Sequence, residues 1–394
     1  MRISSWLLAG MLSAAAGSSR AEEAVVEHFV MPMALVERNL NGSGSSNLFP
    51  MAQGVYNGLL APTNGFVPEQ SGYFQITVYS DRSFSGRMNV AGGSTPLRGR
   101  FDQQGLARFS VSWRSWDDCL CFYELRLVWN VTLELLPGTN IIQGTAENVK
   151  YGWNTELFGL KGRSRNDGTA PEKGRYTMRL PGSSDPAVAP GGEGYGVVKV
   201  DSLGNVTATG ALADGFKYCR TAVLSTNGWW PFYISLNDGR GAVIGWLNFS
   251  NAPTSDIAGD LLWARPHNDE RQYYPSGYIG VSAARGARYV APLSGALALS
   301  WSNGVFRLSG GNLSAPVTNS VTLNSSGLTD NGGTITNVTF SLDRGTGVFR
   351  GKFRHPISGK GTSYAGALNQ LEDIGAGYFL GSSQGGLVRL EAVP

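Results

Sequence analysis

One short pattern recurs in this chain and constrains its fold more than any other feature. In Gly72–Phe101 apolar and polar residues alternate, a polar tip follows, and a second apolar strand begins at Phe84. Gly194–Leu212 and Thr339–Phe353 repeat the order of apolar alternation, an aspartate, a glycine turn and a further apolar run. Alternation with a period of two indicates half-buried strands. The sequence therefore predicts one hairpin unit, used several times, whose copies bury their apolar faces against neighbours.

The composition agrees with a protein made of many short strands. Glycine accounts for 54 of the 394 residues, about twice the usual share of ~7%. The glycines lie between short apolar runs, where turns require positive φ. Hydrophobic residues make up 42% of the chain, which is ample for packed cores. Because no helical periodicity follows residue 50, the predicted fold class is all-β.

The strand candidates fall into two or three antiparallel modules in tandem, each barrel-like or sandwich-like and of the up-and-down type. Eight regularly spaced strands in residues 50–165 form module 1. A polar linker, Arg163–Lys173, leads into module 2 at residues 174–266, and module 3 spans residues 275–394. Modules 2 and 3 could also form one domain.

The N-terminus has the features of a secretory signal. Residues 1–21 contain Arg2, an apolar stretch and a small-residue cleavage pattern around Arg20; residues 22–49 are interpreted as an N-terminal arm. No other window approaches the ~18 apolar residues of a membrane helix. We therefore expect an exported protein, extracellular, at the cell surface or periplasmic, with no transmembrane segment after signal removal.

The charge balance argues against a nucleic-acid partner. The chain has 32 basic and 29 acidic residues, and two of the basic ones, Arg2 and Arg20, lie in the predicted signal. The mature chain is therefore close to neutral, whereas nucleic-acid binding requires a basic patch.

The longest aromatic hairpin lies at Gly228–Phe249. Its Asp238-Gly239 pair predicts a two-residue type I′ turn. Such a turn pairs residues of one face across the two strands: Trp229 with Asn248, Pro231 with Trp246, Tyr233 with Ile244, Ser235 with Ala242. The opposite face is apolar and must be core, so three aromatic side chains gather on the outer face. A one-residue change in turn length would exchange the two faces.

Two interpretations of that outer face remain open. Flat aromatic rings bordered by polar groups suit stacking on sugars, which makes Trp229, Tyr233, Trp246 and Asn248 the candidate ligand-binding residues for a polysaccharide or a cell-surface component. The alternative, which we favour, is that the face packs against a neighbouring module, because exposed apolar patches usually mark an interface.

No convincing catalytic constellation is present. A glycosidase needs two carboxylates ~5–9 Å apart, and no such pair can be placed from the sequence. The literal Gly-x-Ser-x-Gly match at Gly381–Gly385 leads into a strand rather than the helix of a nucleophile elbow, so it predicts a hairpin turn. Of the three histidines, His355 is expected in a turn and His267 in a solvated loop. No cofactor is expected.

The three cysteines do not define a site. Export permits disulfides, and Cys219 could bridge to Cys119 or Cys121, or all three could stay unpaired. A metal site would lack a fourth ligand at recognisable spacing, so no metal is predicted.

Several motifs, in order along the chain, resemble a known type of module. They are Tyr56-Asn57-Gly58-Leu59, Ser71-Gly72-Tyr73-Phe74, Phe84-Ser85-Gly86, Gly310-Gly311-Asn312-Leu313, Gly347–Gly351 and Gly377–Gly381. The chain resembles an uncharacterised β-rich repeat module found in large exported proteins, immunoglobulin-like or adhesin-like, of environmental bacteria. The resemblance covers nearly the whole mature chain and implies no activity, cofactor or site residue.

Together these observations predict a secreted or cell-surface, non-catalytic β-repeat protein with a structural or ligand-binding, adhesion-type role. One alternative is a carbohydrate-binding protein that uses the aromatic face. A less favoured one is a polysaccharide-active enzyme, which would require two acidic residues converging in one cleft.

Overall fold

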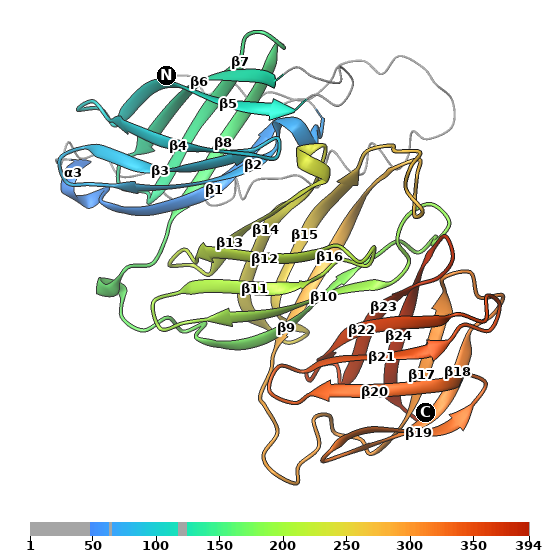
Figure 1. Cartoon of the computed structure of the whole chain (residues 1–394). Helices are drawn as coiled ribbons and strands as arrows, with labels where there is room; N and C mark the ends of the chain where they lie inside the picture. The colour runs from blue at the N-terminus through green and yellow to red at the C-terminus, as the bar shows by residue number, and fades with distance from the viewer. Residues whose placement is uncertain (1–47, 63–64, 117–123, 394) are drawn as a thin grey trace.

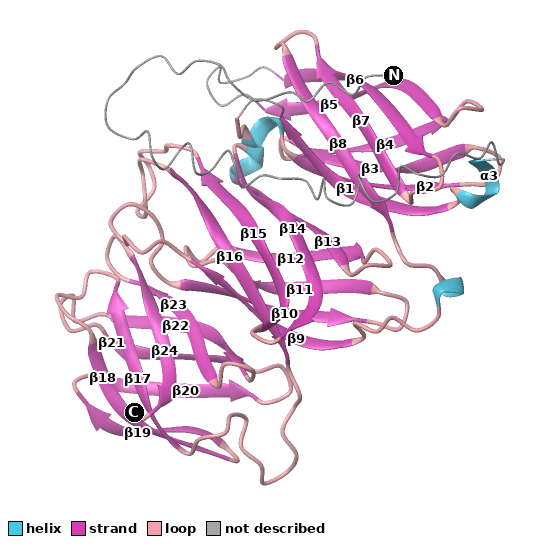
Figure 2. Ribbon diagram, turned by 180° about the vertical axis from the view of Figure 1, so that it is seen from behind, coloured by secondary structure: helices cyan, strands magenta, loops and turns pink. Residues whose placement is uncertain are grey.

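A computed structural model describes residues 48–62, 65–116 and 124–393. It contains three eight-stranded antiparallel sheets that follow one another in a row (Figures 1 and 2). Each sheet curls into a nearly closed barrel, so the expected all-β fold of tandem antiparallel barrels is confirmed. The signal and most of the N-terminal arm lie outside the described residues. We call the units barrel 1 (β1–β8), barrel 2 (β9–β16) and barrel 3 (β17–β24).

The strands are short and close to those the alternation predicts. Barrel 1 consists of β1 (Gly54–Pro62), β2 (Gly72–Val78), β3 (Ser83–Val90), β4 (Gly93–Arg100), β5 (Leu106–Trp116), β6 (Glu124–Leu136), β7 (Ile141–Asn148) and β8 (Trp153–Lys161). Barrel 2 consists of β9 (Gly174–Pro181), β10 (Glu193–Val200), β11 (Asn205–Ala211), β12 (Lys217–Val223), β13 (Trp229–Leu236), β14 (Gly241–Ala252), β15 (Ser255–Arg265) and β16 (Tyr278–Arg288). Barrel 3 consists of β17 (Asn303–Gly310), β18 (Val317–Asn324), β19 (Gly327–Gly333), β20 (Thr336–Asp343), β21 (Val348–Arg354), β22 (Gly361–Asn369), β23 (Ile374–Leu380) and β24 (Gly385–Ala392). Helical structure in the described chain is limited to short pieces such as α3 (Leu48–Met51), η1 (Pro68–Gln70), η3 (Arg165–Asp167) and η4 (Asn237–Gly239).

In each barrel the first and last strands of the chain segment pair with each other. Asn57 of β1 lies opposite Leu160 of β8, and equivalent pairings join β9 to β16 and β17 to β24. In each barrel one pair of neighbouring strands is not joined by a hydrogen-bond ladder, and we call this gap the seam. It lies between β4 and β5 in barrel 1, between β12 and β13 in barrel 2, and between β19 and β20 in barrel 3. The seam therefore follows the fourth strand in the first two barrels and the third strand in the last.

The recurring hairpin occupies equivalent places in the first two barrels only. Gly72–Phe101 forms β2 to β4, and Gly194–Leu212 forms β10 and β11, the second and third strands of barrel 2. Thr339–Phe353 instead forms most of β20 and β21, the fourth and fifth strands of barrel 3.

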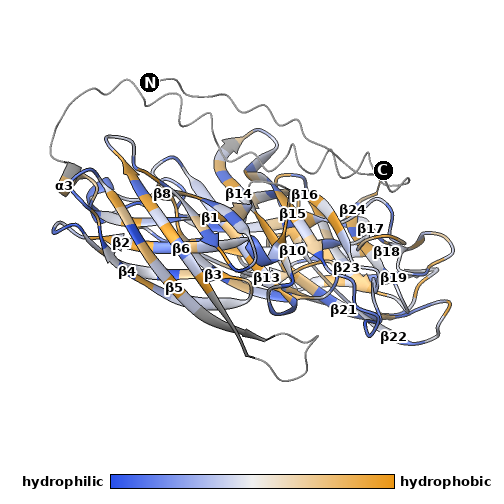
Figure 3. Ribbon diagram, turned by 90° about the horizontal axis from the view of Figure 1, so that it is seen from above, coloured by the Kyte–Doolittle hydropathy of each residue, from blue (hydrophilic) through white to orange (hydrophobic). Residues whose placement is uncertain are grey.

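The alternating pattern places one face of each strand inside its barrel. In β2, Phe74, Ile76 and Val78 are fully buried, while the residues between them are partly exposed. Hydrophobic and hydrophilic colours accordingly change along individual strands in Figure 3. Each barrel has its own core cluster, centred on large side chains such as Trp129, Trp230 and Phe306. Full burial of such a side chain stabilises the fold by roughly 2–3 kcal/mol.

The border between the second and third units differs from the sequence-based division at residues 266 and 275. Strand β16, Tyr278–Arg288, pairs with β15 and β9 and is the eighth strand of barrel 2. Its small residues, Ser282 to Ala284 and Gly286 among them, give weak alternation, so the sequence does not reveal which sheet it joins. Strand β8 ends at Lys161 and β9 begins at Gly174, so the segment Arg163–Lys173 lies between barrels 1 and 2.

Candidate functional site

The aromatic hairpin β13–β14 has the predicted register. Trp229 lies opposite Asn248, Pro231 opposite Trp246 and Tyr233 opposite Ile244. The turn itself is longer than predicted: Leu236 pairs with Gly241, leaving four residues, Asn237–Arg240, in the loop. The register is still the predicted one, because the loop is longer by one residue at each end. A change of two residues in loop length leaves every side chain on its predicted face.

The outer face of this hairpin packs against barrel 1. Tyr233 and Trp246 are 6% and 8% exposed and belong to an apolar cluster with residues of barrel 1. The cluster consists of Leu59, Ile141, Phe158 and Leu160 from barrel 1 and of Tyr233, Ala242, Ile244, Trp246 and Leu262 from barrel 2. The rings of Phe158 and Trp246 meet edge to face, with centroids 5.8 Å apart. The structure therefore brings these two predicted residues together as the junction between barrels.

The other two predicted residues lie at the end of the same face. Trp229 is half-buried and packs at the edge of the cluster. Asn248, also half-buried, donates from Nδ2 to the backbone oxygen of Asn227 at 3.1 Å. Neither residue lines either of the two grooves described below.

Two polar features complete the junction. The buried Asn57 of barrel 1 accepts a hydrogen bond on Oδ1 from the backbone nitrogen of Val223, at 3.0 Å. The turns containing Gly92 and Gly239 touch through their backbones: a Cβ on Gly239 would lie 2.0 Å from the carbonyl carbon of Ala91. Only glycine fits there, because Gly239 also has φ of +94°.

Beside this junction lies a groove that both barrels form, with a volume of about 510 Å³. We call it the inter-barrel groove. Its lining residues in the described chain are Tyr73, Gln75, Arg87, Asn89, Val90, Gly92, Gly93 and Ser94 from barrel 1, and Cys219, Arg220, Thr221, Trp230, Pro231, Tyr233 and Ser235 from barrel 2. Of the predicted site residues, Tyr233 alone is among them.

The barrel 1 wall of the groove is a polar patch on the outer face of β2, β3 and β4. Tyr73 lies opposite Asn89, and Gln75 lies opposite Arg87. The four residues therefore form two neighbouring cross-strand pairs on one face of the sheet. Arg87 donates from Nη1 to the hydroxyl of Ser94 at 3.2 Å. The wall thus presents amide, hydroxyl and guanidinium groups beside an aromatic ring.

The barrel 2 wall contains a buried hydroxyl without a hydrogen bond of normal geometry. Among the described residues, the Ser235 side chain is the polar neighbour of the Tyr233 hydroxyl, and the two make no hydrogen bond of normal geometry. Burial raises the pKa of Tyr233 to about 12, against smaller lowering contributions from the Ser235 side chain and the Arg220 guanidinium. A neutral phenol that can both donate and accept therefore lies in the groove wall.

Arg220 bridges the open seam of barrel 2. Its Nε donates to the backbone oxygen of Tyr233 at 2.8 Å, and its Nη1 donates to the oxygen of Cys219 at 3.0 Å. Both acceptors are neutral, so no carboxylate balances the charge in these contacts. Burial lowers the pKa of Arg220, because desolvation penalises the guanidinium. Cys219 beside it is exposed and carries a free thiol, whereas Cys119 and Cys121 lie outside the described residues.

A second groove lies between barrels 2 and 3, and hydrogen bonds join the two barrels beside it. It also measures about 510 Å³ and is lined by Gln272, Tyr273 and Tyr378 among others. Tyr273 donates its hydroxyl to the backbone oxygen of Gly381 at 2.8 Å, and Gln272 donates to that of Ser382 at 2.9 Å. These bonds hold the two barrels together, so we assign this groove to the junction.

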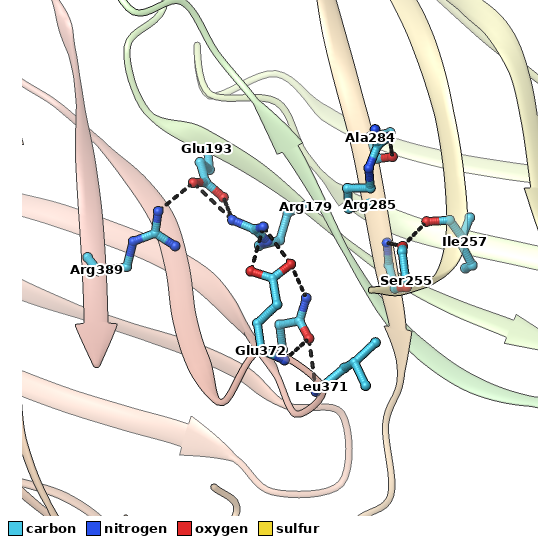
Figure 4. Close-up of polar contacts among 11 residues, drawn as sticks. Arg179, Glu193, Ser255, Ile257, Ala284, Arg285, Leu371, Glu372 and Arg389 are labelled. Atoms are coloured by element: carbon cyan, nitrogen blue, oxygen red, sulfur yellow. Dashed lines mark hydrogen bonds and ion pairs between the residues drawn. The ribbon is translucent and has the colours of Figure 1, made fainter. Parts of the chain in front are cut away.

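An ion-pair network adds to the same junction (Figure 4). Arg179 of β9 contacts Glu193 of β10 at 2.9 Å and Glu372, in the turn after β22, at 2.7 Å. Arg389 of β24 contacts the other oxygen of Glu193 at 3.1 Å. The four side chains thus form one chain of ion pairs with alternating charge, in the order Arg389, Glu193, Arg179, Glu372, and each barrel contributes two of them.

The motifs with a catalytic resemblance have structural roles. Gly381–Gly385 forms the turn between β23 and β24, as predicted, and Asn312 accepts the backbone N–H groups of Ser383 and Gln384. His355 is buried in a turn, where Nε2 contacts the oxygen of Gly311 at 2.9 Å. His267 pairs with Asp269 in an exposed loop.

Sequence reasoning missed most of the groove. Arg87 and Arg220 are 133 positions apart in the chain, and neither stands in a motif. The one signal that pointed there was the outer-face alternation of β13, which identified Tyr233.

Comparisons with known proteins were made for the whole chain. No family model matches, and no curated protein matches. Among solved structures, it is similar to a double mutant of the vaccine antigen transferrin binding protein B from Haemophilus parasuis, at 10% identity and a TM-score of 0.22, covering 86% of this chain and 75% of that one.

Two further solved structures show similar values. Intact Ap-TbpB, with its N and C lobes, is 11% identical with a TM-score of 0.23, and the match covers 86% of this chain and 76% of that one. A putative outer membrane protein from Bacteroides fragilis is 12% identical with a TM-score of 0.22, covering 61% and 98%. At these values the function has to be argued from the groove itself. Within the described residues, no helix has the length and apolarity needed to cross a bilayer.

Proposed function

We propose that this chain is an exported, non-catalytic binding protein of the cell surface or extracellular space, and that the inter-barrel groove binds a saccharide. The observation that carries the proposal is the groove itself: about 510 Å³, built by two barrels, with the half-buried ring of Tyr73 and with amide, hydroxyl and guanidinium side chains in its lining. Ligand pockets combine aromatic and polar side chains in this way to hold and orient a ligand.

The chemistry of the lining favours a sugar. Sugar rings have an apolar face and a hydroxyl-bearing edge, and they are bound by aromatic rings combined with amide and hydroxyl side chains. The half-buried Tyr73, together with Pro231, supplies apolar surface, whereas Tyr233 is occupied by its contact with barrel 1. The polar side chains of the lining are Gln75, Asn89, Ser94, Thr221 and Ser235.

The same lining supports binding rather than hydrolysis. Glycoside hydrolysis requires a carboxylic acid and a second carboxylate flanking the bond. The described residues that line the inter-barrel groove include no aspartate, glutamate or histidine. A saccharide held there would therefore meet no carboxyl group among those lining residues.

Intrinsic tryptophan fluorescence tests the proposal, since Trp230 lines the groove. The purified chain is titrated with soluble neutral and acidic polysaccharides, and binding is repeated by calorimetry. Ser94→Phe places a ring in the groove from an exposed position. Ser341→Phe is the matched control, because Ser341 is exposed on the outer face of β20, in barrel 3.

The proposal predicts saturable binding that Ser94→Phe abolishes and Ser341→Phe leaves intact, with equal melting temperatures for both variants. Binding that survives Ser94→Phe would move the site elsewhere. Absence of binding to every polysaccharide of the panel would overturn the proposal and leave the barrels a purely structural role.

A further inference from the structure

We infer, on the premise of the proposed saccharide groove, that its ligand is an acidic saccharide whose carboxylates pair with Arg87 and Arg220. The two arginines come from different barrels, Arg87 from β3 and Arg220 from β12, and both line one groove.

The first step is the state of Arg220. The side chain is half-buried, and it donates hydrogen bonds to the backbone oxygens of Tyr233 and Cys219. Those bonds use Nε and Nη1, and Nη2 takes part in neither. A half-buried guanidinium held by neutral acceptors gains most from an anion, because charge-assisted hydrogen bonds are about twice as strong as neutral ones.

The second step is the position of Arg87. It is exposed on β3, opposite Gln75 and Pro96, and its contact with Ser94 holds the side chain along the outer face of the sheet. Arginine presents a planar fork that matches a carboxylate in a bidentate manner. A uronic acid unit lying on Tyr73 or Pro231 could therefore turn its carboxylate to either guanidinium.

The third step is the absence of competing anions in the lining. No carboxylate belongs to the lining residues of the inter-barrel groove in the described chain. Asp238, in the Asn237–Arg240 turn, abuts Gly92 through its backbone and is not among the lining residues. The groove therefore carries a net positive lining.

A saccharide fits this lining better than other polyanions. A nucleic acid would need many phosphate contacts along a basic track, and the groove offers two cations. An acidic peptide would not use the ring-and-amide arrangement of Tyr73, Gln75 and Asn89. The test therefore includes an acidic peptide and a nucleic acid as alternative ligands.

The test compares two polymers that differ in charge alone. Calorimetry measures binding of polygalacturonate and of its fully methyl-esterified form to the full chain at low salt. We expect esterification to weaken binding by at least about tenfold, because it removes the carboxylate that the arginines recognise. Added NaCl should weaken binding of the acid form and leave the ester form unchanged.

Variants locate the effect. Arg87→Met should remove most of the preference for the acid form, and Arg87→Lys should keep part of it. Arg350→Met is the control, since Arg350 is exposed on β21 of barrel 3 and lines neither groove. Both positions are on the surface, and the melting temperature verifies folding of all three variants.

The outcomes separate the two proposals. Equal binding of both polymers overturns the acidic class and leaves the saccharide groove standing. No binding of any polysaccharide overturns the proposed function itself. Equally tight binding of poly-glutamate or single-stranded DNA, with the same loss in Arg87→Met, overturns the saccharide assignment and keeps an anion site.

Discussion

The Nη2 atom of Arg179 in barrel 2 lies 2.7 Å from each carboxylate oxygen of Glu372 in barrel 3. The same guanidinium uses Nη1 to hold Glu193, whose side chain is only 10% exposed. One arginine thus neutralises two carboxylates, one from each side of the junction. Arg389 of barrel 3 pairs with Glu193 as well, so the ion pairs across this junction are made by two arginines, one from each barrel.

We therefore expect Arg179→Met to reduce the free energy of unfolding by about 2–4 kcal/mol, because the poorly solvated Glu193 loses its closest cation. The control is Arg307→Met, which breaks the exposed pair with Glu391 at 3.6 Å and should cost under about 1 kcal/mol. Urea unfolding measures both. Equal effects of the two variants would contradict the assigned role of Arg179.

The packing of Trp246 on Phe158 leads to a second prediction. Trp246→Ala opens a cavity between barrels 1 and 2 and should cost about 3–5 kcal/mol. Phe158→Ala should lower the stability too, but the double variant should lose less than the sum, since the rings contact each other. The measurement is a double-mutant cycle by urea unfolding. Additive losses would mean that the rings contribute independently.

The contact between the Gly92 and Gly239 turns can be tested with alanine. Gly239→Ala combines positive φ with a Cβ 2.0 Å from backbone of barrel 1, so we expect a loss well above the ~1 kcal/mol of the backbone strain alone. Gly138→Ala is the control, because its φ is +74° and no atom lies within 4 Å of the added Cβ. Thermal unfolding compares them, and similar melting temperatures would exclude the backbone contact.

Acid should weaken the linker between barrels 1 and 2. The carboxylate of Asp167 accepts from the backbone and the hydroxyl of Ser164 at 2.6 and 2.8 Å, and the backbone hydrogen bond, with the side-chain bond next, lowers the pKa of Asp167. A lowered pKa in the folded state means that stability is present above the unfolded value, about 3.8, and is lost as the pH falls through the folded value.

Asp167→Asn should therefore be less stable than the natural chain at pH 7, and the difference should shrink below about pH 3.5, where the carboxylate becomes protonated. Urea midpoints at several pH values give the comparison. A difference that is constant with pH would show that the charge of Asp167 contributes nothing to the linker.

The sequence predicts strands well where one face is buried and alternation is strong. All eight strands of barrel 1 and the register of β13–β14 agree with the pattern. The alternation fails where an apolar run belongs to a loop that covers a core. Leu297–Trp301 has the pattern of a strand, yet it forms a loop whose Ala298, Leu299 and Trp301 pack against the core of barrel 3. Strand β19 cannot be recognised from the alternation, because its glycines and polar residues resemble a turn.

The sequence does not predict the inter-barrel groove, for a different reason. Its walls are outer faces of strands from two barrels, and outer faces carry ordinary polar residues with no pattern of their own. Tyr233 is the exception, since its position in a hairpin fixed the face on which it lies. Which barrel covers that face depends on how the barrels dock, and no local spacing encodes the docking.

The pairing of first and last strands has a consequence for how such a chain can grow. Because β1 and β8 are antiparallel neighbours, the chain enters and leaves barrel 1 at the same end, about one strand spacing apart, ~5 Å. The same holds for the other two barrels. Each barrel is thus a unit whose two chain ends lie side by side. Duplication or deletion of a whole barrel could therefore lengthen or shorten the molecule without changing the strand order of any other sheet.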